Sequence, residues 1–287
     1  MIGGNTVIMK RRPKVGFQGE LGAFSHEAIR RLLGDNAQPV PFQRFEEVFR
    51  ALAARKLDAA VIPIENTLAG SVHENYDHLL RFDLRIAGET NVRIVHNLIV
   101  PPGVRFADLR RVYSHPVALN QCLDFFTHNP KIEKVPFYDT AGSVKMVMEQ
   151  KPSDAGAIAS AVAATIYGGR ILRRSIEDDR QNFPRFFLLN GARRLPPVSP
   201  GKGWKTSLVF TVRNAPGELF RSVSAFGLRD LNLTKIESRP LRGKPWEYLF
   251  YLDLLGLVDD PKVRNALGHL AEMADFLRVV GSYPKGD

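Results

Sequence analysis

The sequence contains a single cysteine, Cys122, which excludes an intrachain disulfide and any metal site built from a cysteine cluster. No apolar run approaches the roughly 18 residues that a membrane-spanning helix needs. The basic cluster Lys10, Arg11 and Arg12 follows the short apolar N-terminal stretch, which is the wrong order for a secretory signal peptide. These absences make the cytoplasm the expected compartment, and we expect no membrane partner.

The chain also lacks a clustered ladder of basic and aromatic residues, which is the usual mark of a nucleic-acid surface. The formal net charge is +10 at pH 7, but the positive residues are spread along the chain in local pairs such as Arg30–Arg31. We therefore expect no nucleic-acid partner, whereas an anionic substrate agrees with the charge. A length of 287 residues is enough for about two globular domains.

What the chain does contain is an arginine between aromatic residues, within the segment from Asp178 to Phe187. Residues 186–189 are apolar and predict a buried strand, so Arg185 would lie at the start of that strand. A guanidinium in such a place can bind a carboxylate through two hydrogen bonds. The alternative is a structural ion pair with Asp178 or Asp179, or a guanidinium that reaches solvent along its aliphatic stem.

Polar residues also follow four predicted strands of an alternating α/β pattern, where the next helix begins. These junctions contain Ser25, then Glu65, Asn66 and Thr67, then Ser114 and His115, and finally Thr140. Ligands of open α/β sheets bind at the carboxyl ends of the strands, so four junctions favour one shared rim around a small anion. Each junction has a local alternative, because hydroxyl side chains cap helices and a lone histidine is commonly a surface imidazole. The rim offers no metal-ligand set.

A proline- and glycine-rich stretch at residues 191–203 predicts a linker. The elements predicted after it are a strand at 204–212, a helix at 217–228, strands at 231–236 and 246–255, a helix from Pro261 and a short strand at 278–280. This order is typical of a ferredoxin-like split βαβ fold. Its loops at 214–217 and 237–240 would bind a small zwitterion; the alternative is a module that dimerises edge to edge, and the two roles are compatible.

Taken in order, these motifs resemble the prephenate dehydratase family with a C-terminal ACT domain, over residues 14–281. The family's successive motifs are matched by residues 19–25, 63–72, 114–116 and 139–141, its Thr-Arg-Phe signature by residues 182–186, and the phenylalanine-binding ACT motifs by residues 217–219 and 237–240. The resemblance implies an α/β catalytic region at 14–190 with two lobes, similar to periplasmic binding proteins. It also implies a linker at 191–203 and a ferredoxin-like α+β ACT domain at 204–281.

The resemblance further implies that prephenate is converted to phenylpyruvate with loss of water and carbon dioxide, in L-phenylalanine biosynthesis. It implies a hydro-lyase without a cofactor, feedback control by L-phenylalanine, and a homodimer or homotetramer. The chemistry agrees with the residues, because aromatisation drives the reaction. The protein then has to orient the substrate, hold two carboxylates and assist the departure of hydroxide.

The site residues follow from the same resemblance. The expected catalytic residues are Arg185, Thr67, Thr140 and His115. The expected substrate-binding residues are Ser25, Glu65, Asn66, Ser114, Asn182 and Phe186. The expected phenylalanine-binding residues are Gly217, Leu219, Asn232, Leu233, Glu237, Ser238, Arg239 and Pro240.

Three positions depart from the family pattern. Pro184 stands where the signature has threonine, and proline has neither a hydroxyl nor an N–H group. Val117 replaces a usual glutamine, and Glu218 replaces a small residue of the first ACT motif. We therefore predict that Thr67, Thr140 or His115 delivers the proton, or that turnover is low. An arogenate dehydratase and a non-catalytic sensor of aromatic ligands are the alternatives.

Overall fold

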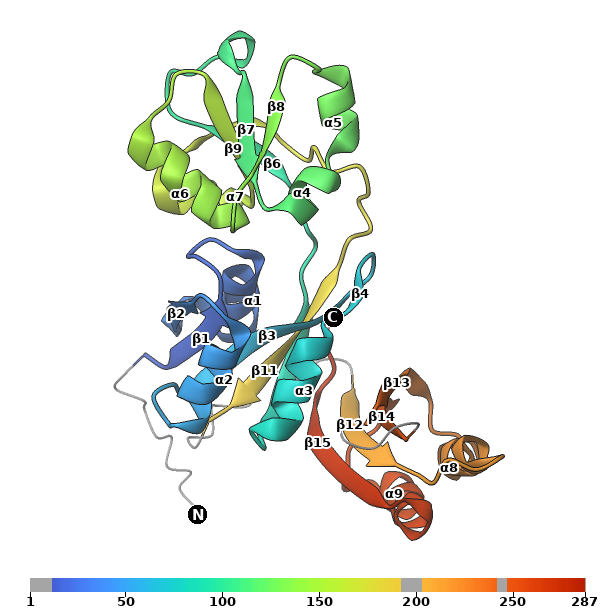
Figure 1. The fold of residues 1–287 in the computed structure, drawn as a ribbon. Coiled ribbons are helices and arrows are strands. Elements are labelled where there is room, and N and C mark those ends of the chain that lie inside the picture. The colour runs from blue at the N-terminus through green and yellow to red at the C-terminus, as the bar shows by residue number, and fades with distance from the viewer. Residues whose placement is uncertain (1–11, 192–202, 242–246, 287) are drawn as a thin grey trace. The chain divides into compact units, whose positions relative to one another are not determined.

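The computed structural model describes residues 12–191, 203–241 and 247–286 (Figure 1). Within these limits the chain forms two compact units, one from residues 12–82 and 91–191 and the other from residues 83–90, 203–241 and 247–286. The predicted linker at 191–203 lies, apart from its two end residues, outside the described residues. The segment 83–90 is thus part of the second unit, although it lies far from the rest of that unit in the sequence.

The first unit contains two lobes, each built on its own sheet. The elements of the first lobe are β1 (Lys14–Gln18), α1 (Phe24–Leu33), a 3-10 turn (Gly34–Asn36), β2 (Gln38–Phe42), α2 (Phe45–Ala53), β3 (Ala59–Asn66), β4 (Gly70–Ser71), α3 (His73–Arg81) and β11 (Pro184–Asn190). The strand order is β11–β3–β1–β2, and β4 pairs with β3. β1 is parallel to β2 and β3, whereas β11 is antiparallel to β3. α1 packs against β3 and β11, and it buries Ala28, Ile29 and Leu32 at helical spacing.

The second lobe has a separate five-stranded sheet with the order β10–β6–β9–β7–β8. Its elements are β6 (Asn97–Val100), a 3-10 turn (Phe106–Asp108), β7 (Arg111–Ser114), α4 (Pro116–Asn120), α5 (Leu123–His128), β8 (Glu133–Pro136), α6 (Thr140–Gln150), β9 (Ala155–Ala159), α7 (Ala161–Tyr167) and β10 (Arg170–Arg173). β7 is parallel to β8 and β9, and β6 is antiparallel to β9 and β10. Leu119, Cys122, Leu123 and Phe126 have the spacing of one helix, but the chain forms two short helices here, because Cys122 leaves the helical conformation (φ −130°, ψ 35°).

Two chain segments connect the lobes, and hydrogen bonds join them to each other. Val92 N–H donates to the Pro184 carbonyl at 3.1 Å, and Ile94 N–H donates to the Asn182 carbonyl at 2.9 Å. Further along, Ile176 N–H donates to the His96 carbonyl at 2.9 Å. Residues 92–96 therefore belong to this connection, and β6 begins only at Asn97.

The second unit is a five-stranded sheet with two helices. Its elements are β5 (Arg85–Asn91, all but its last residue), β12 (Trp204–Thr211), α8 (Glu218–Gly227), β13 (Leu233–Pro240), β14 (Tyr248–Leu255), α9 (Pro261–Met273) and β15 (Phe276–Pro284). The order is β13–β14–β12–β15–β5, with antiparallel pairs except for β15 and β5. β15 approaches β5 closely at Gly281, where a Cβ atom would lie 2.6 Å from the Ile86 carbonyl oxygen.

The predicted fold class, a two-lobed α/β region followed by an α+β domain, is confirmed. Two details of the α+β domain differ from the prediction. The short strand predicted at 278–280 is the longer strand β15, and the loop predicted at 237–240 belongs to strand β13. Half-buried and exposed residues alternate along β13, as in a strand whose two faces differ in exposure. In the described part of the chain, no helix is long and apolar enough to cross a bilayer.

Candidate functional site

Arg185 forms an ion pair with Glu65 across strands β11 and β3. Its Nη1 donates to Glu65 Oε1 at 3.0 Å, and the two side chains are 8% and 28% exposed. The guanidinium carbon also lies 4.8 Å from the centroid of the Phe187 ring. The strand register places Arg185 directly opposite Glu65, which gives this carboxylate the partner that a strand carboxylate needs.

The ion pair with Asp178 or Asp179 that was the alternative for Arg185 is wrong in its partner. The carboxylate of Asp178 instead accepts hydrogen bonds from the backbone N–H groups of Leu123 and Asp124, at the start of α5. Asp179 accepts one from the N–H of Gln181. Asp178 therefore binds the start of α5, 55 residues away in the sequence, and Asp179 shapes a local turn.

The side chain of Asn66 forms hydrogen bonds within the turn after β3 and to Asn182, two residues before β11. Its Nδ2 donates to Asn182 Oδ1 at 2.7 Å. Its Oδ1 accepts from the N–H groups of Leu68 and Ala69, at 2.8 and 3.1 Å. Asn182 is almost fully buried, so this amide pair fixes the approach of the chain to Arg185.

Thr67 holds the same approach through its hydroxyl. The hydroxyl donates to the Gln181 carbonyl at 2.7 Å and accepts from the Phe183 N–H at 2.9 Å. It does not cap a helix, because α3 begins after Val72. Since the hydroxyl proton is already donated to a carbonyl, Thr67 would have to break this bond before it delivered a proton.

Pro184 is the first residue of β11 and is buried opposite Asn66. Its carbonyl accepts from Val92 N–H, and its nitrogen has no proton to leave unpaired. The first residue of a strand is one of the few sheet positions where proline is tolerated. Phe186, which was expected to bind the substrate, is 2% exposed and packs in the core of the first lobe.

Ser114 and His115 follow β7 in the second lobe and make local contacts. Ser114 is fully buried and donates to the Ile158 carbonyl at 2.7 Å, which links β7 to β9. His115 is the N-terminal cap of α4, where its Nδ1 accepts from Val117 N–H at 3.3 Å. His115 thus fills the cap role considered for this junction.

The hydroxyls of Ser25 and Thr140 make no hydrogen bond to another residue in the described chain. Ser25 is the second residue of α1 and is not its cap, because the cap position is Ala23 and has no side-chain bond. Thr140 is the first residue of α6, and only its carbonyl is engaged, by Ser143 Oγ at 2.6 Å. The described chain therefore engages neither hydroxyl, and Ser25 itself is 8% exposed.

The loop before α1 contacts the second lobe and brings these hydroxyls to one boundary. Glu20 accepts from Tyr138 Oη at 3.0 Å and from Lys145 Nζ at 3.4 Å. Ser160 Oγ donates to the Gly22 carbonyl at 2.7 Å. Gly22 has φ +92°, and a Cβ atom there would lie 2.7 Å from Ala163 Cα, so glycine is required for this approach.

Two acidic groups at the boundary between the lobes have raised pKa values. Burial, followed by the nearby Glu20 charge, raises the pKa of Asp139, although the Gly142 N–H at 2.7 Å opposes this. Burial and the bond to Glu20 raise the pKa of Tyr138 to about 12. The sequence predictions missed Glu20, Tyr138 and Lys145, and the only available signal was that Glu20 and Asp139 lie inside the motifs at 19–25 and 139–141.

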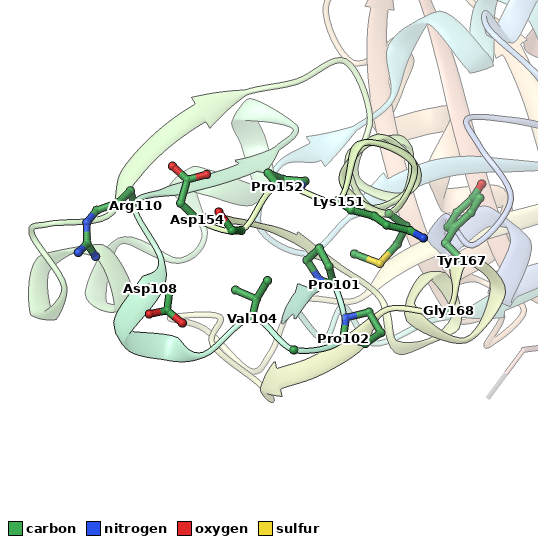
Figure 2. Close-up of a pocket in the computed structure, with 13 residues that line it drawn as sticks. Pro101, Pro102, Val104, Asp108, Arg110, Lys151, Pro152, Asp154, Tyr167 and Gly168 are labelled. Atoms are coloured by element: carbon green, nitrogen blue, oxygen red, sulfur yellow. The ribbon is translucent and has the colours of Figure 1, made fainter.

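The predicted residues thus fall into two groups. Direct contacts join Arg185 to Glu65 and Asn66 to Asn182, with Thr67 beside them. Ser25, His115 and Thr140 lie at the lobe boundary, where His115 is close enough to Asp139 to lower its pKa. A cavity of about 950 Å³ lies on the second lobe, and none of the predicted residues is among those that line it (Figure 2).

The residues expected to bind phenylalanine lie on two elements of the second unit. Gly217 is the N-terminal cap of α8 at φ +83°, and Leu219 in the first turn is 41% exposed. Glu218 pairs with Arg221 at 2.6 Å, so its charge is compensated locally. Asn232 precedes β13, and this strand contains the remaining residues, which are Leu233, Glu237, Ser238, Arg239 and Pro240.

Glu237 is paired with Lys235 at 2.9 Å. The described residues contain no cluster of three or more histidines, cysteines or acids with the arrangement of a metal site.

Comparisons with known proteins identify the relatives of this chain. A family model described as prephenate dehydratase matches residues 15–194. Arogenate dehydratase 2 of Petunia hybrida is 44% identical over 289 residues, which cover 95% of this chain and 72% of that protein. Arogenate dehydratase/prephenate dehydratase 2 of Arabidopsis thaliana, a chloroplastic protein, is 44% identical over 284 residues, which cover 95% and 73%.

Solved structures agree in fold. A structure described as GqqA, a novel type of quorum quenching acylase, has a TM-score of 0.86 at 33% identity, and covers 95% of this chain and 98% of its own. Prephenate dehydratase of Arthrobacter aurescens in complex with L-Phe has a TM-score of 0.84 at 30% identity, and the coverages are 94% and 90%.

The predicted cytoplasmic location is wrong on these comparisons. The related dehydratases 1 and 2 of Arabidopsis thaliana are both named chloroplastic, which overturns the prediction. The prediction rested on what the sequence lacks, and such absences do not identify a compartment.

Proposed function

We propose that this chain, which belongs to the prephenate dehydratase family, converts prephenate to phenylpyruvate in L-phenylalanine biosynthesis. The observation that carries the proposal is the 44% identity, over 95% of the chain, to a relative named for arogenate and prephenate dehydration. The enzyme is a carbon–oxygen lyase that acts without a cofactor. Residues 14–190 form its catalytic region, 191–203 its linker and 204–281 its ACT domain.

Arg185 anchors a substrate carboxylate in this proposal. The ion pair with Glu65 and the ring of Phe187 fix the plane of its guanidinium. A guanidinium has five N–H donors, so Arg185 can bind a substrate carboxylate while it remains paired with Glu65. Asn66 and Asn182 hold the backbone that positions Arg185, and this preorganisation lowers the cost of orienting the substrate.

The reaction breaks two bonds of the prephenate ring. The ring carboxylate leaves as carbon dioxide, the electrons of its C–C bond complete the aromatic ring, and the C–O bond to the hydroxyl breaks. The departing hydroxide takes one proton and leaves as water. Thr140 and Ser25 are suited to donate hydrogen bonds to the leaving hydroxyl, because their own hydroxyls are not engaged by the described chain.

Proton delivery is the step that Pro184 alters. The signature threonine is absent, and the Thr67 proton is donated to the Gln181 carbonyl. We assign delivery to Thr140 or to His115, whose Nδ1 is already an acceptor in the α4 cap. Pro184→Thr is expected to raise kcat, and Thr140→Val to lower it; an unchanged kcat in Pro184→Thr would mean that the missing hydroxyl does not limit turnover.

The substrate is prephenate or its amine counterpart, arogenate. Relatives of equal similarity are named for arogenate alone and for both activities, so parallel assays of kcat/KM on the two substrates decide the preference. Formation of phenylpyruvate from prephenate is expected. Binding of aromatic ligands without turnover of either substrate would instead support a sensor.

The second unit is proposed to bind L-phenylalanine as an ACT domain. The structure of the Arthrobacter relative was solved with L-Phe. The two segments that match the ACT motifs lie at the start of α8 and at the end of β13. Because Arg221 forms an ion pair with Glu218, the negative charge of Glu218 would repel the carboxylate of phenylalanine less. Calorimetry of the full chain is expected to show phenylalanine binding, which Gly217→Val should weaken. Light scattering tests the proposed homodimer or homotetramer.

A further inference from the structure

A second cavity, of about 690 Å³, lies in the first unit and is lined by both lobes and by the segment that connects them. One wall is a face of α1 that includes Phe24, Glu27 and Arg31. The connecting segment contributes Arg93, Val95 and Asn97, and the second lobe contributes residues 160–162 and 174–175. None of the residues assigned above to substrate binding lines this cavity.

Four arginines line the cavity, namely Arg30, Arg31, Arg93 and Arg174, against two carboxylates, Glu27 and Asp35. The positive charge therefore exceeds the negative charge on the lining. A hollow surface with an excess of one charge concentrates counterions of the other sign. Guanidinium groups are the side chains best suited to hold phosphate, because their fork makes two parallel hydrogen bonds.

The arginines differ in how firmly they are held. Arg93 donates to Glu177 and to the Arg180 carbonyl, both at 3.0 Å, and the Glu177 side chain is 1% exposed. Arg30 pairs with Asp35 at 3.0 Å, but the two side chains are 50% and 82% exposed, so an arriving anion can displace this pair.

Arg31 donates to Glu27 and to the Asn91 carbonyl, both at 2.9 Å. Arg174 differs from the other three arginines. It is exposed, and no hydrogen bond or ion pair joins its side chain to another residue in the described part of the chain. Three other guanidinium groups line the same cavity. An anion that binds the unpaired Arg174 can therefore contact more than one positive charge.

We propose that this cavity binds a phosphate or pyrophosphate group, held by Arg174 from the second lobe and by Arg30 and Arg31 from α1. The apolar lining formed by Phe24, Val95 and Val162 would accommodate the organic part of a phosphorylated ligand. This proposal does not depend on the reaction assigned to the enzyme.

A ligand bound there touches both lobes and the connection between them. The 92–96 and 176–184 segments, which connect the lobes, are hydrogen-bonded to each other. An anion shared between α1 and Arg174 favours the arrangement in which these groups are close. The cavity is therefore an effector site within the first unit, separate from the phenylalanine site proposed for the second.

The test is calorimetry of pyrophosphate binding to the full chain, without substrate, in the wild type, Arg174→Ala and Arg173→Ala. Arg173→Ala is the matched control, because it removes the same charge one residue away. The Arg173 guanidinium does not line the cavity and lies over the Phe106 ring, at 5.1 Å from its centroid. Saturable binding is expected in the wild type. Loss of Arg174 should weaken it about tenfold, as one charge-assisted hydrogen bond is worth about that factor, whereas loss of Arg173 should change it less than twofold.

Hydrogen exchange supplies the second measurement. Bound pyrophosphate should slow amide exchange at residues 92–97 and 160–162 in the wild type but not in Arg174→Ala. The proposal is overturned if pyrophosphate does not bind at millimolar concentration, if both variants weaken binding equally, or if malonate at the same ionic strength binds as well. Near-UV circular dichroism establishes that each variant is folded, and a chain without dehydratase activity would still give a valid result.

Discussion

The ion pair between Glu65 and Arg185 gives the most direct test of how the candidate site is built. Glu65→Gln keeps the shape of the side chain and an oxygen that accepts from Arg185 Nη1, which lies at 3.0 Å from the carboxylate. It removes the negative charge. The substitution therefore isolates the electrostatic part of the interaction and leaves the packing unchanged.

The size of the effect follows from burial. Removing one partner of a fully buried ion pair costs about 3–5 kcal/mol, because the other charge is left uncompensated. The Arg185 side chain is 8% exposed and Glu65 is 28% exposed, so solvent screens part of the pair. Since glutamine still accepts the hydrogen bond, we expect the free energy of unfolding to fall by about 1–1.5 kcal/mol, the difference between a hydrogen bond to a charged group and one to a neutral group.

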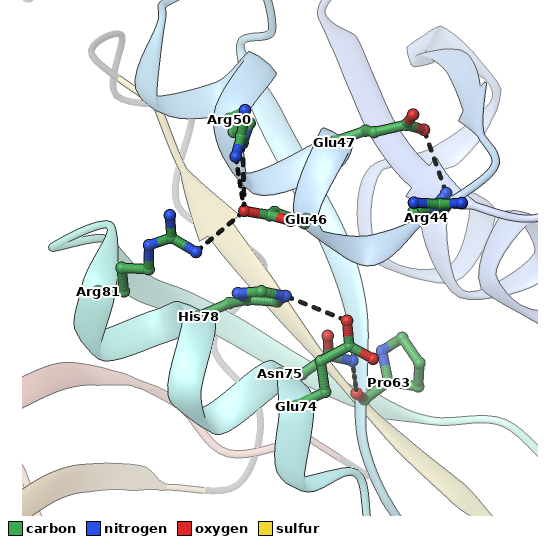
Figure 3. Close-up of polar contacts among 9 residues, drawn as sticks. All are labelled: Arg44, Glu46, Glu47, Arg50, Pro63, Glu74, Asn75, His78 and Arg81. Carbon is green, nitrogen blue, oxygen red and sulfur yellow. Dashed lines mark hydrogen bonds and ion pairs between the residues drawn. The ribbon is translucent and has the colours of Figure 1, made fainter. Parts of the chain in front are cut away.

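Urea unfolding, followed by circular dichroism, measures this loss. Glu46→Gln is the matched control: its carboxylate accepts from Arg50 and Arg81 between α2 and α3 (Figure 3). The two arginines are 64% and 59% exposed, against 8% for Arg185, so solvent screens the control pair more and the control should lower stability less. An equal or smaller loss in Glu65→Gln than in Glu46→Gln would refute the view that a buried charge pair fixes Arg185. Arg185→Lys should reduce kcat/KM as well, because an ammonium lacks the planar fork.

Three further substitutions test other parts of the first unit. Asp139→Asn still accepts a hydrogen bond from Gly142 N–H. In the wild type the folded state raises the pKa of Asp139, so the carboxyl group contributes its full stabilisation below its ordinary pKa. That contribution is lost as pH rises through the raised pKa. Urea unfolding between about pH 4 and pH 8 should therefore show a weaker pH dependence in the variant, and an unchanged profile would count against the shift. Gly22→Ala should lower the melting temperature through a loss of about 1–3 kcal/mol, because φ is +92° and Ala163 blocks a Cβ; an unchanged melting temperature would contradict the close approach. Thr67→Val should cost about 1 kcal/mol for each of its two hydrogen bonds, and Thr67→Ser should restore most of that stability in the same urea experiment.

The order of strands and helices in the first unit followed from the sequence, because apolar runs of strand length alternate with helical spacing. The partner of Arg185 did not follow. Glu65 is 120 residues away, and only the antiparallel register of β11 on β3 brings the two together. A local reading offered Asp178 and Asp179, which are nearer in sequence but are engaged by backbone N–H groups.

Two other failures have similar causes. The segment from 83 to 90 joins the second unit through a parallel contact of β15, which no local pattern encodes. Residues 237–240 were expected to form a loop because they are polar and end in proline. They form the end of β13, an edge strand in the described sheet, where polar side chains and Pro240 are tolerated.

The anchoring of the segment before β11 determines how the Pro184→Thr experiment should be interpreted. Four hydrogen bonds hold this segment: Asn66 to Asn182, Thr67 to Gln181, Phe183 to Thr67, and Ile94 to the Asn182 carbonyl. None of them involves the side chain or the nitrogen of residue 184, so a threonine there should leave Arg185 opposite Glu65. An increase in kcat without a change in KM would then report the restored hydroxyl alone. A shift in KM would show instead that proline itself positions the carboxylate anchor.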